Sequence, residues 1–122
     1  MRETIKAYLQ SRGITATIYI DFLPASPDTA LLIRQTPGRM PDSIGYSLPS
    51  VQVISRAASY ITARDNIELT QSYLHAQNYS STISGAPYII DIWKLQDPYF
   101  MGRDDKDRFT FVQNYQVQIK DL

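Results

Sequence analysis

Between Pro49 and Asn78 the spacing of hydrophobic residues changes, and the change predicts a strand that leads into a helix. From Ser50 to Arg56 the side chains alternate at a period of two, which is typical of a half-buried strand. Beyond Ser59 the apolar positions recur at helical spacing and form one stripe: Tyr60, Ala63, Ile67, Thr70 and Leu74. Ser59 suits the N-cap of this helix, and Asn78 suits its end because Asn tolerates the left-handed conformation. We therefore expect a helix of about five turns packed across the sheet.

The same helix has a second apolar side, which a surface helix of a small domain normally lacks. Its members lie roughly opposite the first stripe by the rule of 100° per residue: Ala58, Leu69, Tyr73 and Ala76. Two explanations remain open at this point. Another helix of the same chain covers this side, or a neighbouring subunit covers it.

The remaining periodic stretches predict one further helix and four further strands. Residues Thr4–Arg12 carry apolar side chains at helical spacing, and Gly13 supplies the stop. The predicted strands are Ile14–Phe22, Thr29–Gln35, Tyr88–Leu95 and Phe109–Lys120. We expect the second strand to run antiparallel to the first across a short connection. The last two strands are expected to form a long antiparallel hairpin.

The last two strands differ in how clearly they assign side chains to faces. The last strand has one apolar face, which only Gln113 interrupts. In the preceding strand Ile89 and Ile92 fall on opposite faces, and both faces are rather apolar, which indicates a strand covered on both sides. The whole pattern predicts an α+β fold in the order α-β-β-β-α-β-β. We expect a single domain over residues 1–122, with two helices on one face of an antiparallel or mixed five-stranded sheet.

Two turn-rich segments interrupt this pattern, at Thr36–Leu48 and Gln96–Arg108. Connections of this length are uncommon inside compact domains and are often functional. Three residues at the tip of the first segment are candidates for contact with a partner: Arg39, Met40 and Asp42. The alternative is a surface loop without a role.

The second segment ends in a run of consecutive charged residues: Arg103, Asp104, Asp105, Lys106, Asp107 and Arg108. A calcium loop starting at Asp104 would need a Gly at its sixth position and a Glu at its twelfth, but Phe109 and Tyr115 stand there. A solvated turn between two strands is the simplest interpretation. Its mixed charges also suit recognition of a complementary protein surface.

Composition narrows the possible functions. The chain has 122 residues, no cysteine, and 12 basic against 12 acidic residues. The absence of cysteine excludes disulfides and thiolate metal sites, and the balanced charge lacks the excess that nonspecific DNA binding uses. No apolar run is long enough for a membrane span, and the N-terminus lacks the apolar centre of a secretory signal. Nine tyrosines favour protein–protein contact, although strand propensity also explains them.

The sequence contains no recognisable catalytic constellation. The only histidine, His75, falls on a polar side of the predicted helix, where we expect it to be solvated. The chain lacks a cysteine nucleophile, a phosphate-binding glycine loop, and HExxH or GxSxG spacing. We therefore expect no enzyme activity, no cofactor and no metal site.

Three stretches of the chain, together with the order of elements, resemble a known family. They are QTPGRMPD at Gln35–Asp42, LPSVQVISRAASYITA at Leu48–Ala63, and DPYFMGRDDKDRFTFVQNYQV at Asp97–Val117. Together they span most of the chain from Ala30 onward. These stretches resemble the tail-terminator or minor capsid proteins of long-tailed bacteriophages. The N-terminal helix matches that family in type only, and none of the matching motifs is catalytic.

The resemblance implies a structural role in a virion at the head–tail junction, with assembly in the cytoplasm of a bacterial host. Tail terminators form a ring, usually a hexamer, on the last ring of the tail tube, stop tube polymerisation and present a surface to the head connector. The implied partners are copies of the same chain, the tail tube protein and a connector or neck protein, with no membrane and no specific nucleic acid. The loops at Arg39–Asp42 and Arg103–Arg108 become candidates for ring-to-ring contact, and Leu69, Tyr73 and Ala76 for subunit packing.

Two other interpretations remain beside this one. A head-completion or connector protein of the neck also forms rings and is the main alternative. A nucleic-acid-binding regulator is disfavoured by the neutral charge and by the absence of a basic helix.

Overall fold

The computed structural model describes residues 1–39, 46–75, 77–78 and 89–120 of the chain. In these residues the elements follow the order α1 (Arg2–Ser11), β1 (Thr17–Ile20), β2 (Ala30–Arg39), β3 (Tyr46–Ala57), α2 (Tyr60–Leu74), β4 (Gln77–Asn78), β5 (Ile89–Lys94), β6 (Tyr99–Arg103) and β7 (Phe109–Lys120). The strands form one seven-stranded sheet in the order β1-β2-β3-β7-β5-β4, with β6 paired to β7.

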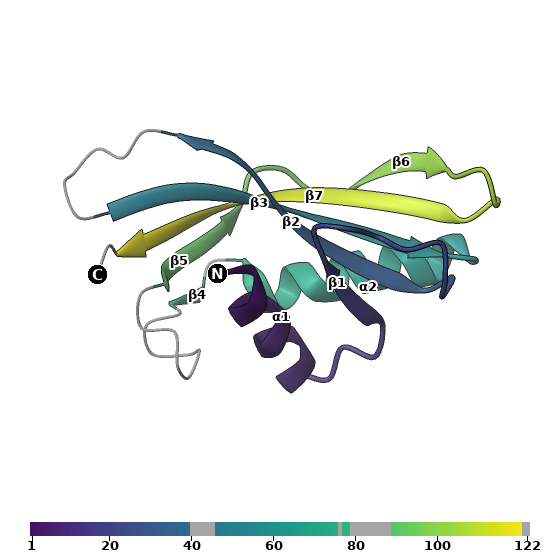
Figure 1. Ribbon diagram of the computed structural model, residues 1–122, viewed down its shortest axis with the longest axis horizontal. Helices are drawn as coiled ribbons and strands as arrows, with labels where there is room; N and C mark the ends of the chain where they lie inside the picture. The colour runs from purple at the N-terminus through teal and green to yellow at the C-terminus, as the bar shows by residue number, and fades with distance from the viewer. Residues whose placement is uncertain (40–45, 76, 79–88, 121–122) are drawn as a thin grey trace.

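Both helices lie on one face of this sheet (Figure 1). Helix α1 contacts β1 and β2, and α2 contacts β3, β5 and β7. The predicted α+β class, the mixed sheet and the order α-β-β-β-α-β-β are confirmed. Strands β4 and β6 are additional to the five that the sequence predicted.

The prediction that the first two strands are antiparallel was wrong. Strand β1 pairs with β2 in parallel, with Thr17 opposite Ala30 and Ile20 opposite Ile33. Parallel neighbours need a connection that returns the chain to the starting end of the sheet. Residues 21–29, which we call the crossover segment, supply that return in place of a tight turn. The backbone at Asp21 adopts a positive φ of 67° as the segment leaves β1.

Helix α2 begins as predicted and ends earlier than predicted. The Ser59 side chain accepts a hydrogen bond from the Thr62 amide, which confirms the N-cap. The stripe of Ala63, Ile67, Thr70 and Leu74 is buried as expected, but Tyr60 is 42% exposed. The helix ends at Leu74 and not at Asn78, because the chain turns into an extended backbone at His75 and joins the sheet as β4.

His75 is not the solvated helix residue that the sequence predicted. Its ring Nδ1 accepts a hydrogen bond of 3.0 Å from the backbone amide of Lys94 in β5. The His75 amide in turn donates to the Gln71 carbonyl at 2.9 Å, which caps the helix. This half-buried side chain therefore joins the end of α2 to the sheet.

The core between the helices and the sheet is apolar except for Ser55, Thr70 and one buried amide. Ile5, Leu9, Ile67 and Leu74 contribute from the helices and are fully buried. Full burial of an aliphatic side chain stabilises the fold by roughly 1.5–3 kcal/mol.

Gln113 is the buried amide, and it explains the interruption in the apolar face of β7. Its Nε2 donates to Gln71 Oε1 at 2.6 Å and to the Gln96 carbonyl at 2.8 Å, and the Tyr115 hydroxyl donates to its Oε1 at 2.5 Å. Every strong hydrogen-bonding atom of the Gln113 side chain is therefore satisfied, as a buried polar group requires. Burial in this setting raises the pKa of Tyr115.

The face assignment in β5 was wrong, because the strand contains an irregularity. The register against β7 shifts between Ile89 and Asp91, which adds one residue to β5. A β-bulge of this kind changes which side chains share a face. Ile89 and Ile92 are therefore both buried in the same core, although strict alternation places them on opposite sides.

Candidate interaction surface

The charged run predicted from the sequence forms the turn of the β6–β7 hairpin, and Asp104 organises it. The Asp104 Oδ1 accepts hydrogen bonds from the backbone amides of Lys106 and Arg108, at 3.0 and 2.9 Å. The Asp104 carbonyl accepts from the Asp107 amide at 3.0 Å, and Asp107 has a positive φ of 60°. Asp is one of the few residue types that tolerates this conformation. The turn is therefore ordered by its own side chains, and it is not a freely solvated loop.

Arg108 is buried, contrary to the prediction of a solvated charged run. Its side chain is 6% exposed, and its Nε donates to Asp104 Oδ2 at 2.8 Å. It also donates to the Ala25 carbonyl and forms an ion pair with Asp28 at 3.5 Å. Arg108 thus ties the hairpin to the crossover segment.

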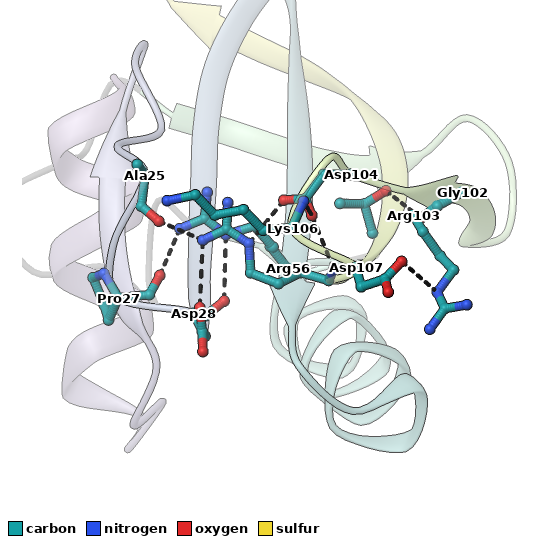
Figure 2. A network of polar contacts seen from close by, with 11 residues as sticks. Ala25, Pro27, Asp28, Arg56, Gly102, Arg103, Asp104, Lys106 and Asp107 are labelled. Atoms are coloured by element: carbon teal, nitrogen blue, oxygen red, sulfur yellow. Dashed lines mark hydrogen bonds and ion pairs between the residues drawn. The ribbon is translucent and has the colours of Figure 1, made fainter.

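A second arginine completes this attachment. The Arg56 Nη2 donates to the Pro27 carbonyl at 2.5 Å and its Nε to the Asp28 carbonyl at 3.3 Å. Arg56 comes from β3 and is 4% exposed. We call Arg56, Asp104, Arg108 and the carbonyls of the crossover segment the arginine clasp (Figure 2).

The clasp lowers the pKa of both Arg56 and Asp104. The shift disfavours the charged form of Arg56 and favours the charged form of Asp104. Burial lowers the pKa of Arg56, and the nearby positive charge of Arg108 lowers it further. For Asp104 burial acts to raise the pKa, but hydrogen bonds from Arg108 and Lys106 outweigh it and the pKa lies below the usual value. The Asp104 carboxylate is therefore held in its charged form.

The remaining charges of the run lie on the outside of the hairpin. Arg103, Asp105, Lys106 and Asp107 are exposed. Arg103 lies 3.7 Å from Asp107, and its guanidinium stacks over the Phe109 ring with 4.6 Å to the ring centroid. These four side chains can contact a partner, whereas Asp104 and Arg108 hold the turn in place.

Beside the hairpin is an aromatic cluster that the sequence did not reveal. The Tyr60 ring lies 5.5 Å from Phe100, 5.8 Å from Phe109 and 5.1 Å from Phe111, measured between centroids. The cluster brings the start of α2 next to β6 and β7. The only sequence signal for β6 is the apolar triplet Tyr99-Phe100-Met101, which follows Asp97-Pro98 inside the segment that the sequence predicts to be a loop. All three residues of the triplet are largely exposed.

The predicted second apolar side of α2 does not form one surface. Tyr73 packs partly against the core, and the Arg12 guanidinium lies 5.4 Å from its ring centroid, so the end of α1 covers it. Leu69 is 41% exposed and faces away from the core. Ala76 lies outside the described residues. The same chain therefore covers one part of this side and leaves Leu69 uncovered.

The first predicted loop is shorter than expected, because β2 continues to Arg39 and β3 begins at Tyr46. The backbone of Arg39 pairs with Leu48, whereas its side chain, Met40 and Asp42 lie outside the described residues. Near the end of β2 its backbone approaches the backbone of β3 closely. A Cβ on Gly38 would lie 2.1 Å from the Leu48 carbonyl oxygen, so only glycine fits there.

The pairing of β3 with β7 is interrupted at Leu48 and Pro49, and the Gln116 side chain of β7 satisfies the carbonyls there. Its Nε2 donates to the Leu48 and Pro49 carbonyls at 2.7 and 2.8 Å. The register of β2 against β3 also shifts between Thr36 and Arg39. We call Gly38, Leu48, Pro49 and Gln116 the arm end of the sheet.

Within the described part of the chain, no group of three or more histidine, aspartate or glutamate side chains is placed to hold a metal ion. No helix there is long and apolar enough to cross a membrane. The features that the described surface does present are exposed charges, exposed aromatic area and strand edges, which suit contact with another protein.

Comparison with known proteins agrees with the sequence resemblance. A family model described as bacteriophage tail terminator protein matches residues 8–121. No curated protein sequence matches the chain. Among solved structures, a chain of the virion of a native gene transfer agent (GTA) particle has a similar fold, with a TM-score of 0.70 and 11% sequence identity. The similarity covers 98% of this chain and 94% of that chain.

Proposed function

Because the chain belongs to the bacteriophage tail terminator family, a family of structural virion proteins, we propose that it caps the tail tube as a ring. In this role it ends tube polymerisation and provides the surface to which the head attaches. The observation that carries the proposal is the family match, which extends over residues 8–121. The proposed location is the head–tail junction of the virion, after assembly in the cytoplasm of a bacterial host.

The proposed partners are copies of the same chain, the tail tube protein and a connector protein of the head. A ring, which we propose to be a hexamer, needs a heterologous interface, in which two different surfaces of each copy meet and the rotation closes. It also needs surfaces for the structures above and below it. A domain with exposed side chains at opposite ends of one sheet supplies such surfaces.

The β6–β7 turn is the best described candidate for ring-to-ring contact. The arginine clasp fixes its backbone, so Arg103, Asp105, Lys106 and Asp107 are presented on a rigid support. Mixed exposed charges favour a specific orientation and a specific partner more than they add affinity. Leu69 is the candidate for subunit packing that remains uncovered on α2, at 41% exposed. The segment Arg39–Asp42 stays a candidate contact, since Arg39 ends β2 at the opposite end of the sheet, and Met40 and Asp42 lie outside the described residues.

The decisive experiment is deletion of the gene from its phage, followed by electron microscopy of the lysate. A terminator leaves overlong tails or tails without heads, and expression of the wild-type chain from a plasmid restores normal particles. Tails of normal length beside detached, filled or empty heads would instead identify a head-completion or connector protein and would contradict the proposal.

A second experiment tests the capping step directly. Purified protein added to polymerising tail tube protein should stop elongation, and the tubes should carry an end ring in negative stain. The matched variants are Lys106→Glu, which reverses one exposed charge at the turn, and Lys6→Glu, which makes the same change on α1. Weaker capping by Lys106→Glu alone supports the turn as the tube contact, whereas equal capping by both variants rules it out.

A further inference from the structure

An apolar row crosses the sheet from one edge to the other on the face opposite the helices. The strand registers place its members directly opposite one another in turn: Tyr19 of β1, Leu32 of β2, Ile54 of β3, Val112 of β7 and Tyr99 of β6. Leu32, Ile54 and Val112 form a buried cluster separate from the main core. The row therefore begins and ends with a tyrosine, one at each edge of this part of the sheet.

Both of these edges are open. Among the described residues β1 pairs only with β2, and β6 pairs only with β7. An open edge presents unpaired backbone donors and acceptors to any strand that approaches it, and proteins usually protect such edges with proline, lysine or inward charges. The part of β2 that extends beyond β1 follows this rule, since it contains Arg34 and Pro37.

Strands β1 and β6 lack that protection. The sequence of β1 is TIYI, without proline or charge, and β6 is YFMGR, whose one charge is at its end. Exposed hydrophobic side chains accompany both edges. Phe22, directly after β1, is 73% exposed, and Tyr99 and Met101 of β6 are 49% and 52% exposed. Unprotected apolar edges are retained where another strand covers them.

We propose that β6 of one copy pairs with β1 of a second copy, so that the sheet continues from subunit to subunit. This inference rests on the proposed function, because a ring supplies the repeated neighbour. Strand directions are compatible: β1 is parallel to β2, and the antiparallel pairs β2–β3, β3–β7 and β7–β6 leave β6 opposite in direction to β1. Copies arranged with the same face outward therefore bring the two edges together as an antiparallel pair, the slightly more stable kind.

The side chains are matched as well. When the apolar row continues across the contact, Tyr99 of one copy lies opposite Tyr19 of the next. Met101, the extra residue at the irregularity in β6, then lies near Thr17 of the next copy. Cross-strand aromatic pairs stabilise a sheet, and tyrosine is favoured at interfaces because it combines apolar area with a polar tip. A strand pair this short buries less than the area of about 800 Å² per partner in a standard interface. The contact is therefore weak in solution and becomes persistent when a tube holds the copies side by side.

The absence of cysteine from the chain allows a direct test by crosslinking. Thr17 and Met101 are both exposed, so the double variant Thr17→Cys/Met101→Cys keeps the packed residues unchanged. A short bis-maleimide linker tolerates a shift of one residue in register. The expected product is a ladder of covalent oligomers that ends at a closed ring. A mixture of the two single variants should give only dimers that contain one copy of each.

The matched control is Thr17→Cys/Ser72→Cys, because Ser72 is also exposed but lies on α2, away from the β6 edge. No ladder from the first variant, or equal ladders from both, overturns the pairing of β6 with β1. Rings on tail tubes in the micrographs without any ladder would reject this contact while the capping function stands. A ladder together with unrestricted tube growth would have the opposite meaning, since the contact would hold and the capping function would fail.

Discussion

The two ends of the long β3–β7 ladder are held by different physical means. At the hairpin end, which contains the β6–β7 turn, the arginine clasp joins side chains and carbonyls over a long sequence separation, with Arg108 and Ala25 83 residues apart. At the arm end, the approach of Gly38 to Leu48 leaves no room for a Cβ atom. One end therefore depends on charge and hydrogen bonding, and the other on backbone fit. Substitution and pH should separate these two ends.

The largest expected effect is that of Arg108→Ala at the hairpin end. The change leaves Asp104 Oδ2 and the Ala25 carbonyl without the guanidinium that they bind, and removing one member of a buried charged pair costs about 3 kcal/mol. The measurement is the free energy of unfolding in urea. Arg103→Ala, at an exposed position of the same turn, is the control and should change stability by less than about 1 kcal/mol. Equal losses in the two variants would mean that the clasp does not stabilise the hairpin.

Gly38→Ala tests the arm end and should have the next largest effect. The added Cβ meets the Leu48 carbonyl oxygen, a backbone atom that cannot move aside cheaply, and overpacking of this kind costs about 2 kcal/mol. The control is Gly102→Ala at the hairpin end, where φ is +125° but no atom lies within 4 Å of the new Cβ. There only the backbone conformation is penalised. A smaller loss for Gly38→Ala than for Gly102→Ala would show that the arm relaxes around the methyl group.

Lowering the pH should destabilise the hairpin end but not the arm end, and this is the smallest of the three expected effects. The pKa of Asp104 is lowered in the folded protein, and a free carboxyl titrates at about pH 4. Because its pKa is lower in the folded protein, the ionised Asp104 stabilises the fold above about pH 4. This stabilisation is lost as the pH falls through the pKa of Asp104 in the folded protein. The measurement is the thermal midpoint as a function of pH, compared with Asp104→Asn. The variant should be less stable at neutral pH and approach the wild type in acid.

The arm end supplies the internal control for that experiment. Gly38, Leu48, Pro49 and Gln116 carry no ionisable side chain, so their contribution should not change with pH. Amide hydrogen exchange can follow each end separately. Lower protection factors in acid at the start of β7, with unchanged protection factors at the start of β3 near Leu48, are the expected pattern once the slower intrinsic exchange in acid is taken into account. A parallel loss of protection at both ends would assign the acid effect to the whole fold and not to Asp104.

The sequence predicted correctly those features that depend on residues close to one another in the chain. Ser59 caps α2 because of its own hydroxyl, and Ala63, Ile67 and Leu74 are buried because of their spacing. The direction of β1 relative to β2 could not be predicted in this way. It depends on the path of the crossover segment, which is fixed by arginines in β3 and at the start of β7. Ile89 and Ile92 share a core for a similarly distant reason, since the bulge exists only in pairing with β7.

The candidate interaction surface was predicted in part for the same reason. Arg103, Asp105, Lys106 and Asp107 are exposed as a charged run normally is. Burial of Arg108 could not be foreseen, because its partners are carbonyls of a segment with no pattern of its own. Strand β6 was missed because Tyr99-Phe100-Met101 is short and follows a proline, so its identity as a strand comes only from pairing with β7.

Strand β7 lies inside the sheet and pairs with β3, β5 and β6, yet all three of these strands precede it in the sequence. Until it emerges, β3 has an open edge and the clasp lacks Arg108. Helix α2 and the β2–β3 pair can form early, but the core between them cannot close. The sheet therefore becomes complete only after β7 has been synthesised. Until then β6 has no strand to pair with among the described residues, so the proposed contact between β6 of one copy and β1 of another forms only between copies whose β7 is in place.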